Sequence, residues 1–431
     1  MHRPQAAADG CRSARYVSVQ LRKFPEGRGA NEIVISEFKK RLNGIDKSEL
    51  TSIVRSAQGN DAFEIDDWHY ESLNKGSAHN FGGAYGLYRF SGHGQDSVQK
   101  ERVSWSIILK AFGELSGTGS SNITTWNYWK REVLAYQSGW LADLPGGLTA
   151  PLCFGVTEYP NQEYWIWLED LGSDADAVWP LERYGLVAQH LGQFNGAYLV
   201  GTNPIPTAPW FSKGRVREWL AMAAPVMAEL DTLKAKPIVR QWLPGDTIDR
   251  LKQLWSMREP LLATLDKLPL CLCHHDASRL NLIARQGQDG QDETVAIDWA
   301  IMGTGVVGEE LAAFVGVSLN VLAVGASDAQ RLDTIAFAGY LTGLRDAGWQ
   351  GDANLVRYGF AASMALYLNL AGSLILLKIL YFDIDENEQR ERIIQQATGH
   401  SLAAYMAQKV ALNDFYSTIG SEALRLLEVL G

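Results

Sequence analysis

The stretch LCHHDASRLNLIAR, residues 272–285, carries two adjacent histidines, an aspartate and, five positions later, an asparagine. A second run, TVAIDW at residues 294–299, follows the polar segment QGQDGQDE, and two such runs around a polar turn are typical of a short β-hairpin. Asp276 and Asn281 bracket a tight loop ahead of the hairpin, and Asp298 stands at the end of its second arm. Because a hairpin folds back on itself, we expect Asp298 to approach the other two residues.

Two familiar chemistries fit this stretch poorly. Neighbouring side chains on an extended segment point to opposite sides, so His274 and His275 cannot easily converge on one metal ion. Ser278 stands outside any G-x-S-x-G elbow, and its neighbours Ala277 and Arg279 offer no glycine turn for a hydrolase nucleophile. Phosphoryl transfer fits better, because it needs an aspartate to accept or orient a hydroxyl proton, and an asparagine and a second aspartate to hold a divalent cation.

Length and composition predict a folded protein of more than one lobe. The chain has 431 residues, of which 46% are hydrophobic and 20% charged, so disorder is not expected over most of it. A formal net charge of −10 argues against a general grip on nucleic acid, which needs clustered Lys and Arg. The four cysteines form no C-x-x-C pair, and no apolar run of signal-peptide type follows the N-terminus. We therefore expect a cytoplasmic setting and no nucleic-acid partner; the sequence does not indicate an oligomeric state.

The order of the secondary-structure patterns predicts an α+β, bilobal architecture. Residues 65–170 contain short runs rich in aromatic and β-branched residues, typical of a small antiparallel sheet of five strands, with one helix inserted at 124–144. Residues 171–431 are mostly helical apart from the hairpin. Residues 1–64 are expected to form an N-terminal tail and a helical extension.

One apolar run, FAASMALYLNLAGSLILLKILYF at residues 360–382, approaches the length of a membrane-spanning helix. Asn369 and Lys378 interrupt it, and a charged run follows. We therefore expect a buried helix of the helical lobe and no membrane partner.

The segment HHDASRLN followed by AIDW resembles the H-x-D-x-x-x-x-N motif and the later aspartate of the aminoglycoside phosphotransferase and choline kinase-like family of small-molecule kinases. His274, Asp276 and Asn281 fill the motif positions. The resemblance implies a protein-kinase-like fold, ATP and Mg²⁺ as cofactors, and a small molecule with a hydroxyl group as acceptor. It also implies Asp276 as the catalytic base or hydroxyl orienter, Asn281 and Asp298 as metal ligands, and His274 as a brace of the loop.

The same resemblance predicts a glycine-rich hairpin, a strand lysine and a helix glutamate, in that order. GSAHNFGGAYGLYRF supplies the glycines, SIILK ends in Lys110, and WKREVLAY carries Glu132. Lys110 is expected to contact the nucleotide phosphates while Glu132 holds it; the alternative is a charge pair at the surface. Backbone N–H groups around Ser77, Gly82 and Gly83 are expected to lie over the phosphates.

The segment WIWLEDLG, residues 165–172, resembles the hinge between the two lobes of these kinases. Backbone groups of Leu168, Glu169 and Asp170 are therefore expected to face the adenine edge of the nucleotide.

The residues that select the acceptor are open. His275 stands where the family often has glycine, and Ser278-Arg279 replaces a frequent His-Pro, so these three either contact the acceptor or only shape the loop. Arg279 could instead approach the transferred phosphoryl group or bridge to an acidic side chain. Asp383 and Asp385, in the acidic run FDIDENEQRER, either attract a cationic acceptor or begin a solvated helix.

The leading hypothesis is therefore an ATP- and Mg²⁺-dependent kinase of a small hydroxyl compound such as an aminoglycoside, a choline-like amine or a sugar. A catalytically silent nucleotide-binding sensor or binding module is the alternative. A protein kinase is disfavoured, because no D-F-G…A-P-E segment follows the hairpin.

Overall fold

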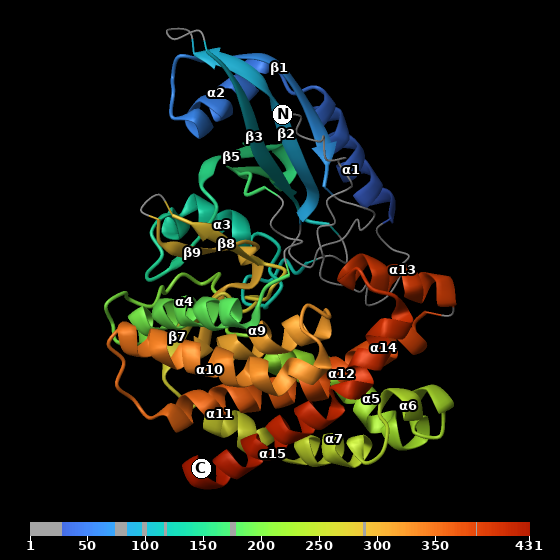
Figure 1. Ribbon diagram of the computed structural model, residues 1–431. Coiled ribbons are helices and arrows are strands. Elements are labelled where there is room, and N and C mark those ends of the chain that lie inside the picture. Colours follow the sequence, from blue (N-terminus) through green and yellow to red (C-terminus); the bar gives the residue numbers. More distant parts are fainter. Residues whose placement is uncertain are drawn as a thin grey trace, which may run out of the picture.

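The computed structural model is an α+β protein with an antiparallel sheet at one end and a large group of helices at the other (Figure 1). It describes residues 28–73, 84–96, 101–115, 119–172, 178–287, 290–384 and 386–431. The predicted contacts of Ser77, Gly82, Gly83 and Asp385 lie outside the described residues.

The sheet has five strands in the order β1-β2-β3-β6-β5, and all neighbouring pairs are antiparallel, as the sequence predicts. The strands are β1 (Phe63–Ser72), β2 (Ala84–Asp96), β3 (Arg102–Phe112), β5 (Cys153–Tyr159) and β6 (Glu163–Glu169). Lys110 lies on the central strand β3, where it pairs with Leu87 of β2 and Ile166 of β6. Strands on both sides therefore fix the position of its backbone.

The two N-terminal helices belong to the hydrophobic core of this sheet. Helix α1 (Arg28–Asn43) and helix α2 (Lys47–Gln58) bury one apolar face in a cluster that also contains Trp165 and Trp167 of β6. Asp46 caps α2 by accepting from Glu49 N, and a left-handed glycine ends it. The helical extension predicted within residues 1–64 is thus a layer that covers the sheet (Figure 1).

The helix predicted at 124–144 is shorter than expected. The structure forms α3 (Arg131–Gln137), followed by a 3₁₀ turn at Trp140–Ala142. Trp129 N donates to the oxygen of Ser120 at 3.1 Å and not to that of Thr125, while the guanidinium of Arg131 donates to the oxygens of Thr125 and Trp126. The segment before α3 therefore folds back as turns.

Two smaller sheets follow. They are formed by β4 (Leu148–Thr149), β8 (Leu282–Gln286) and β9 (Asp292–Ala296) in one sheet, and by β7 (Leu270–Cys273) with β10 (Gly303–Val306) in the other. Strands β8 and β9 lie between the large sheet and the helices (Figure 1). The loop between β7 and β8 contains residues 274–281, and Asp298 follows β9. The hairpin predicted from the sequence is therefore formed by β8 and β9.

The remaining residues are mostly helical. The helices are α4 (Leu181–Leu199), α5 (Val216–Leu233), α6 (Pro237–Trp242), α7 (Thr247–Ser256), α8 (Arg258–Leu265), α9 (Glu309–Asn320), α10 (Ala329–Asp346), α11 (Ala353–Ser363), α12 (Gly372–Tyr381), α13 (Asn387–Thr398), α14 (Leu402–Ala411) and α15 (Asn413–Leu430). Helices α4 and α10 approach so closely that a Cβ on Gly343 would lie 2.0 Å from the Gln189 carbonyl oxygen. Glycine is therefore required at that crossing.

A continuous helix runs through Ala353–Tyr381 and joins α11 to α12 by a π-helical segment, Met364–Ala371. It is long and apolar enough to cross a membrane, but 94% of its apolar window is buried inside the protein. The expectation of a buried core helix fits this position.

Candidate active site

Lys110 joins the sheet to the hairpin through two carboxylates. Its Nζ lies 2.5 Å from Oε2 of Glu132 on α3 and 3.1 Å from Oδ1 of Asp298 after β9. Burial opposes the ammonium form, yet the carboxylates of Asp298 and Glu132 outweigh it and raise the pKa of Lys110. The Glu132 side chain is 1% exposed, so this contact is a buried ion pair and not a charge pair at the surface.

Asp276 and Asn281 close the loop between β7 and β8. Nδ2 of Asn281 donates to the main-chain oxygen of Asp276 at 3.0 Å and to its Oδ2 at 2.9 Å. The main-chain oxygen of Asn281 accepts from Ile297 N at 2.9 Å, one residue before Asp298. The loop and the end of the hairpin are thereby tied together, and the three predicted polar residues lie in one region.

Asn281 and Asp298 offer oxygens that suit a magnesium ion. Because Nδ2 of Asn281 makes both contacts with Asp276, its Oδ1 is the atom left for a ligand. Asp298 adopts left-handed backbone angles (φ 63°, ψ 66°), which are strained for a residue other than glycine and accumulate at functional sites. Within the described ranges, no three His, Cys, Asp or Glu side chains gather as a metal site. Magnesium commonly needs only one or two protein oxygens, with water and phosphate oxygens as its other ligands, so these two residues fit it.

His274 braces the loop. Its Nδ1 accepts from Asp276 N at 3.1 Å, so its Nε2, 3.0 Å from the oxygen of Ile297, carries the hydrogen. Burial lowers the pKa of His274 to about 4, which keeps the ring neutral near pH 7. The ring packs against Trp299 with centroids 4.5 Å apart.

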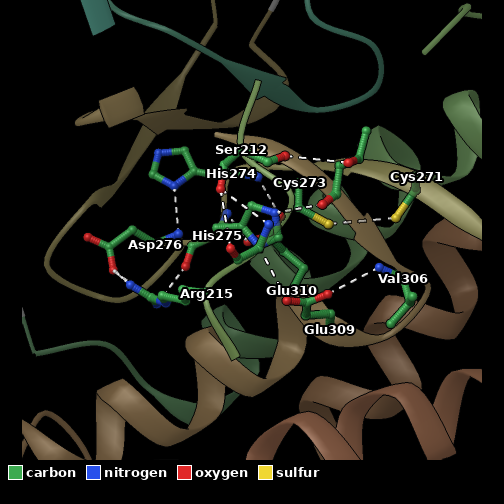
Figure 2. Close-up of polar contacts among 12 residues, drawn as sticks. Ser212, Arg215, Cys271, Cys273, His274, His275, Asp276, Val306, Glu309 and Glu310 are labelled. Carbon is green, nitrogen blue, oxygen red and sulfur yellow. Dashed lines mark hydrogen bonds and ion pairs between the residues drawn. The ribbon is translucent and has the colours of Figure 1, made fainter. Parts of the chain in front are cut away.

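Glu310, at the start of α9, holds the backbone of both histidines. One carboxylate accepts from His274 N at 2.6 Å and from His275 N at 3.0 Å. Figure 2 shows this contact beneath the loop. Glu310 thus fixes the loop through its main chain.

His275 has a different role from the one that its neighbour plays. Its φ is 64°, a left-handed conformation that explains why glycine suits this position in the family motif. Its ring is buried, with Nε2 3.2 Å from the oxygen of Thr304 and Nδ1 3.6 Å from Oε1 of Glu309. Burial and the nearby Arg215 lower its pKa to about 3. The two histidine rings make separate contacts, so they do not form a metal site.

Arg215 is a site residue that the sequence reasoning missed. It precedes α5, its side chain is 6% exposed, and it donates to the main-chain oxygen of His275 at 2.6 Å. Its Nη1 lies 3.4 Å from Oδ1 of Asp276 (Figure 2). Burial raises the pKa of Asp276 while Arg215 opposes that rise. The segment FSKGRVREW around it has no recognisable motif; only the fold reveals this contact.

The other acceptor candidates have these surroundings. Ser278 is fully buried, and Arg279 is 6% exposed, with its guanidinium 4.2 Å from the Trp179 ring. Asp383 forms an ion pair with Lys378 at 2.5 Å. Ser278 and Arg279 therefore lie inside the protein.

The predicted hinge is the end of β6. Leu168 is 7% exposed, and Glu169 N donates to the oxygen of Leu152 at 2.9 Å. The acidic side chains are paired, Glu169 with Arg285 at 3.0 Å and Asp170 with Arg89 at 2.7 Å. These contacts fix the strand end at which the predicted hinge stands.

No family model matches the chain, and no curated protein matches it. Solved structures of small-molecule kinases are similar to it. A choline kinase from Cryptosporidium parvum Iowa II is 14% identical, with 88% of this chain and 99% of that chain covered and a TM-score of 0.48. An aminoglycoside phosphotransferase from Alicyclobacillus acidocaldarius is 11% identical, with 84% and 92% covered and a TM-score of 0.48. An amicoumacin kinase in complex with AMP-PNP and Ca²⁺ is 12% identical, with 84% and 96% covered and a TM-score of 0.44. These proteins are small-molecule kinases, the type that the segments HHDASRLN and AIDW resemble.

Proposed function

We propose that this protein is an ATP- and Mg²⁺-dependent phosphotransferase that phosphorylates a hydroxyl group of a small molecule. The observation that carries the proposal is the convergence of two groups of residues from distant parts of the chain. Lys110 with Glu132 meets Asp298 at 3.1 Å, and Asp298 follows the hairpin that is tied to Asp276 and Asn281. Phosphoryl transfer requires charge neutralisation and alignment, and this arrangement supplies groups for both.

The Lys110–Glu132 pair would hold the nucleotide. The side-chain oxygens of Asn281 and Asp298 would hold the metal ion. Lys110, kept charged and fixed by Glu132, would present its ammonium group to the phosphates. Asn281 and Asp298 would hold Mg²⁺, which supplies positive charge for the phosphate oxygens when bound.

Asp276 would receive the acceptor hydroxyl. Burial raises the pKa of its carboxyl, and a base whose pKa is closer to the working pH accepts a proton more readily. Asn281 holds its Oδ2 at 2.9 Å, so the carboxylate is already oriented in the free protein. The hydroxyl proton would pass to this carboxylate as the new O–P bond forms and the bond from the γ-phosphorus of ATP to its bridging oxygen breaks, which releases ADP.

A small acceptor fits the chain better than a protein acceptor does. Residues 299–308 lead directly from Asp298 through a 3₁₀ turn and β10 into α9. This connection is too short for the long activation segment of a protein kinase. Aminoglycoside-, choline- and sugar-like alcohols are therefore the acceptor classes to test.

A catalytically silent nucleotide-binding module is the second candidate. It would need the Lys110–Glu132 pair for the nucleotide, but it would not need the carboxylate of Asp276 to be held by both Asn281 and Arg215. The two candidates differ in one measurement, the transfer of phosphate to an acceptor.

The test is a screen for ADP release with Mg·ATP across ethanolamine, choline, D-glucose and kanamycin, with mass detection of the phosphorylated product. Asp276→Asn is the blank: we expect it to bind Mg·ATP as the wild type does and to make no product. Asp266→Asn, an exposed aspartate of the helical part paired with Arg217, is the matched control and should keep full activity. Product from Asp276→Asn at the wild-type rate would refute the role of Asp276. Tight binding of Mg·ATP without transfer to any alcohol would favour the silent module.

A further inference from the structure

The carboxylate of Asp276 is held at both of its oxygens. Nδ2 of Asn281 donates to Oδ2 at 2.9 Å, while Nη1 and Nη2 of Arg215 lie 3.4 and 3.5 Å from Oδ1. Contacts at the two oxygens from opposite sides restrict rotation of the carboxylate about its Cβ–Cγ bond, which is otherwise soft. The Asp276 side chain is 14% exposed, so it retains a path to a small acceptor.

Rigid elements deliver Arg215 to this position. Ser212 N donates to the oxygen of Met302 at 3.1 Å, and Ser212 O accepts from Thr304 N at 2.8 Å. The segment before α5 is therefore hydrogen-bonded to β10, and β10 pairs with β7, the strand that leads into the loop. Gly214 follows with a φ of 81° and turns the chain so that Arg215 can reach inward.

Two further contacts fix the guanidinium itself. Nη2 donates to the main-chain oxygen of His275 at 2.6 Å, next to Asp276. The guanidinium also lies 4.4 Å from the ring centroid of Tyr367, in the π-helical segment Met364–Ala371. A buried cation costs desolvation, so a cation retained against a ring, a carbonyl and a carboxylate points to a specific use of its charge.

We propose that Arg215 is a positioning residue for the proposed phosphotransferase reaction: it fixes the plane of the Asp276 carboxylate that receives the acceptor hydroxyl. This inference rests on the proposed function. Arg215 acts through Asp276 and has no need to touch the nucleotide. Its loss should therefore change kcat far more than KM for Mg·ATP.

The experiment compares Arg215→Ala and Arg215→Lys with Arg217→Ala. Arg217 is the matched control, because it stands two residues later, is 54% exposed and pairs with Asp266 at the surface. The probe is Mg·ATP with whichever of ethanolamine, choline, D-glucose and kanamycin gives most product with the wild type. A misplaced catalytic group costs about 100-fold in rate, so we expect Arg215→Ala to lose about 100-fold in kcat with KM for Mg·ATP within about twofold.

Chemical rescue separates positioning from a general structural role. Guanidine at a non-denaturing concentration should restore part of the kcat that Arg215→Ala loses. The kcat of Arg215→Lys should fall between those of the wild type and Arg215→Ala. Arg217→Ala should keep the wild-type kcat with and without guanidine. An unchanged kcat in Arg215→Ala, or a rise in KM for Mg·ATP that accounts for the whole loss, would overturn the proposal.

Crystal structures of the wild type and Arg215→Ala test the same point without any acceptor. We expect the Asp276 carboxylate to rotate and lose its contact with Asn281 in the variant. An Asp276 side chain that keeps its wild-type position would contradict the positioning role. If the wild type phosphorylates no alcohol, the proposed function fails, and the structures still decide whether Arg215 holds Asp276. Thermal unfolding of each variant checks that it is folded.

Discussion

Replacement of His274 by glutamine should change how stability depends on pH. The ordinary pKa of 6.5 falls to about 4 for His274 in the folded protein because the ring is buried. Between these two values the unfolded chain binds a proton that the folded chain does not, so stability is present above 6.5 and is lost as the pH falls toward 4. Each pH unit between these two values is worth ~1.4 kcal/mol. The neutral His274 ring therefore lowers the free energy of unfolding of the wild type by about 3 kcal/mol as the pH falls from 6.5 to 4.

The variant lacks this proton-linked loss. At pH 7 it should be less stable than the wild type by about 1–3 kcal/mol, because Asp276 N and the oxygen of Ile297 lose the ring nitrogens that they contact. On acidification to pH 4.5 the difference should shrink by about 2–3 kcal/mol. His275 is present in both proteins, so its own titration cancels in the comparison.

Urea unfolding followed by tryptophan fluorescence measures both free energies, at pH 7.0 and pH 4.5. His400→Gln, the same change at an exposed histidine, is the control and should leave the free energy of unfolding at pH 7.0 within about 0.5 kcal/mol of the wild type. A His274→Gln difference that does not change with pH would refute the neutral, buried brace.

Three further changes test the site. Asp298→Ala should raise the dissociation constant for Mg·ATP at least about tenfold by titration calorimetry, whereas Asp292→Ala, at the far end of β9, should leave it unchanged. Lys110→Met leaves Glu132 buried without its cation and should lower the free energy of unfolding by about 3–5 kcal/mol. The double variant Lys110→Met/Glu132→Leu should regain most of that loss. If the single and double variants are equally unstable, the result would count against a stabilising ion pair between Lys110 and Glu132. Asn195→Ala removes hydrogen bonds at 2.6 and 2.7 Å to β7 and to a buried tyrosine hydroxyl. It should cost about 2–4 kcal/mol in urea unfolding, and a loss below this range would show that the two partners find others.

Much of the sheet and hairpin could be predicted because their signals are local. Alternating aromatic and β-branched runs indicate the strands, and the polar turn indicates the hairpin that holds Asp298 behind the loop. The order Lys110, Glu132, Asp276, Asn281 follows a known motif, so the candidate residues could be chosen before their distances were known. The contact between Lys110 and Asp298 joins residues 188 positions apart, and the sequence did not predict it.

Other features depend on tertiary contacts that leave no local pattern. Arg131 is fully buried, and its guanidinium also donates to the oxygens of Trp210 and Ala300, so it ties α3 to two distant loops. In the sequence it is one more charged residue at the start of a helix. Arg215 was missed for the same reason, because its contact with Asp276 depends on the pairing of Ser212 with Gly303. The inward direction of Ser278 likewise follows from loop closure and not from its own neighbours.

The π-helical segment makes chain length, and not only composition, critical beside the site. A π-helical turn holds an extra residue relative to an α-helix, so deletion of one residue within Met364–Ala371 would allow an ordinary α-helix to form. The flanking α-helical turns would keep their phase, but the side chains inside the segment would point in new directions. Tyr367, which faces Arg215 and also meets Trp219 edge-on at 4.7 Å, lies at the centre of this segment. Insertions and deletions in this buried helix should therefore be far less tolerated than exchanges among its apolar side chains.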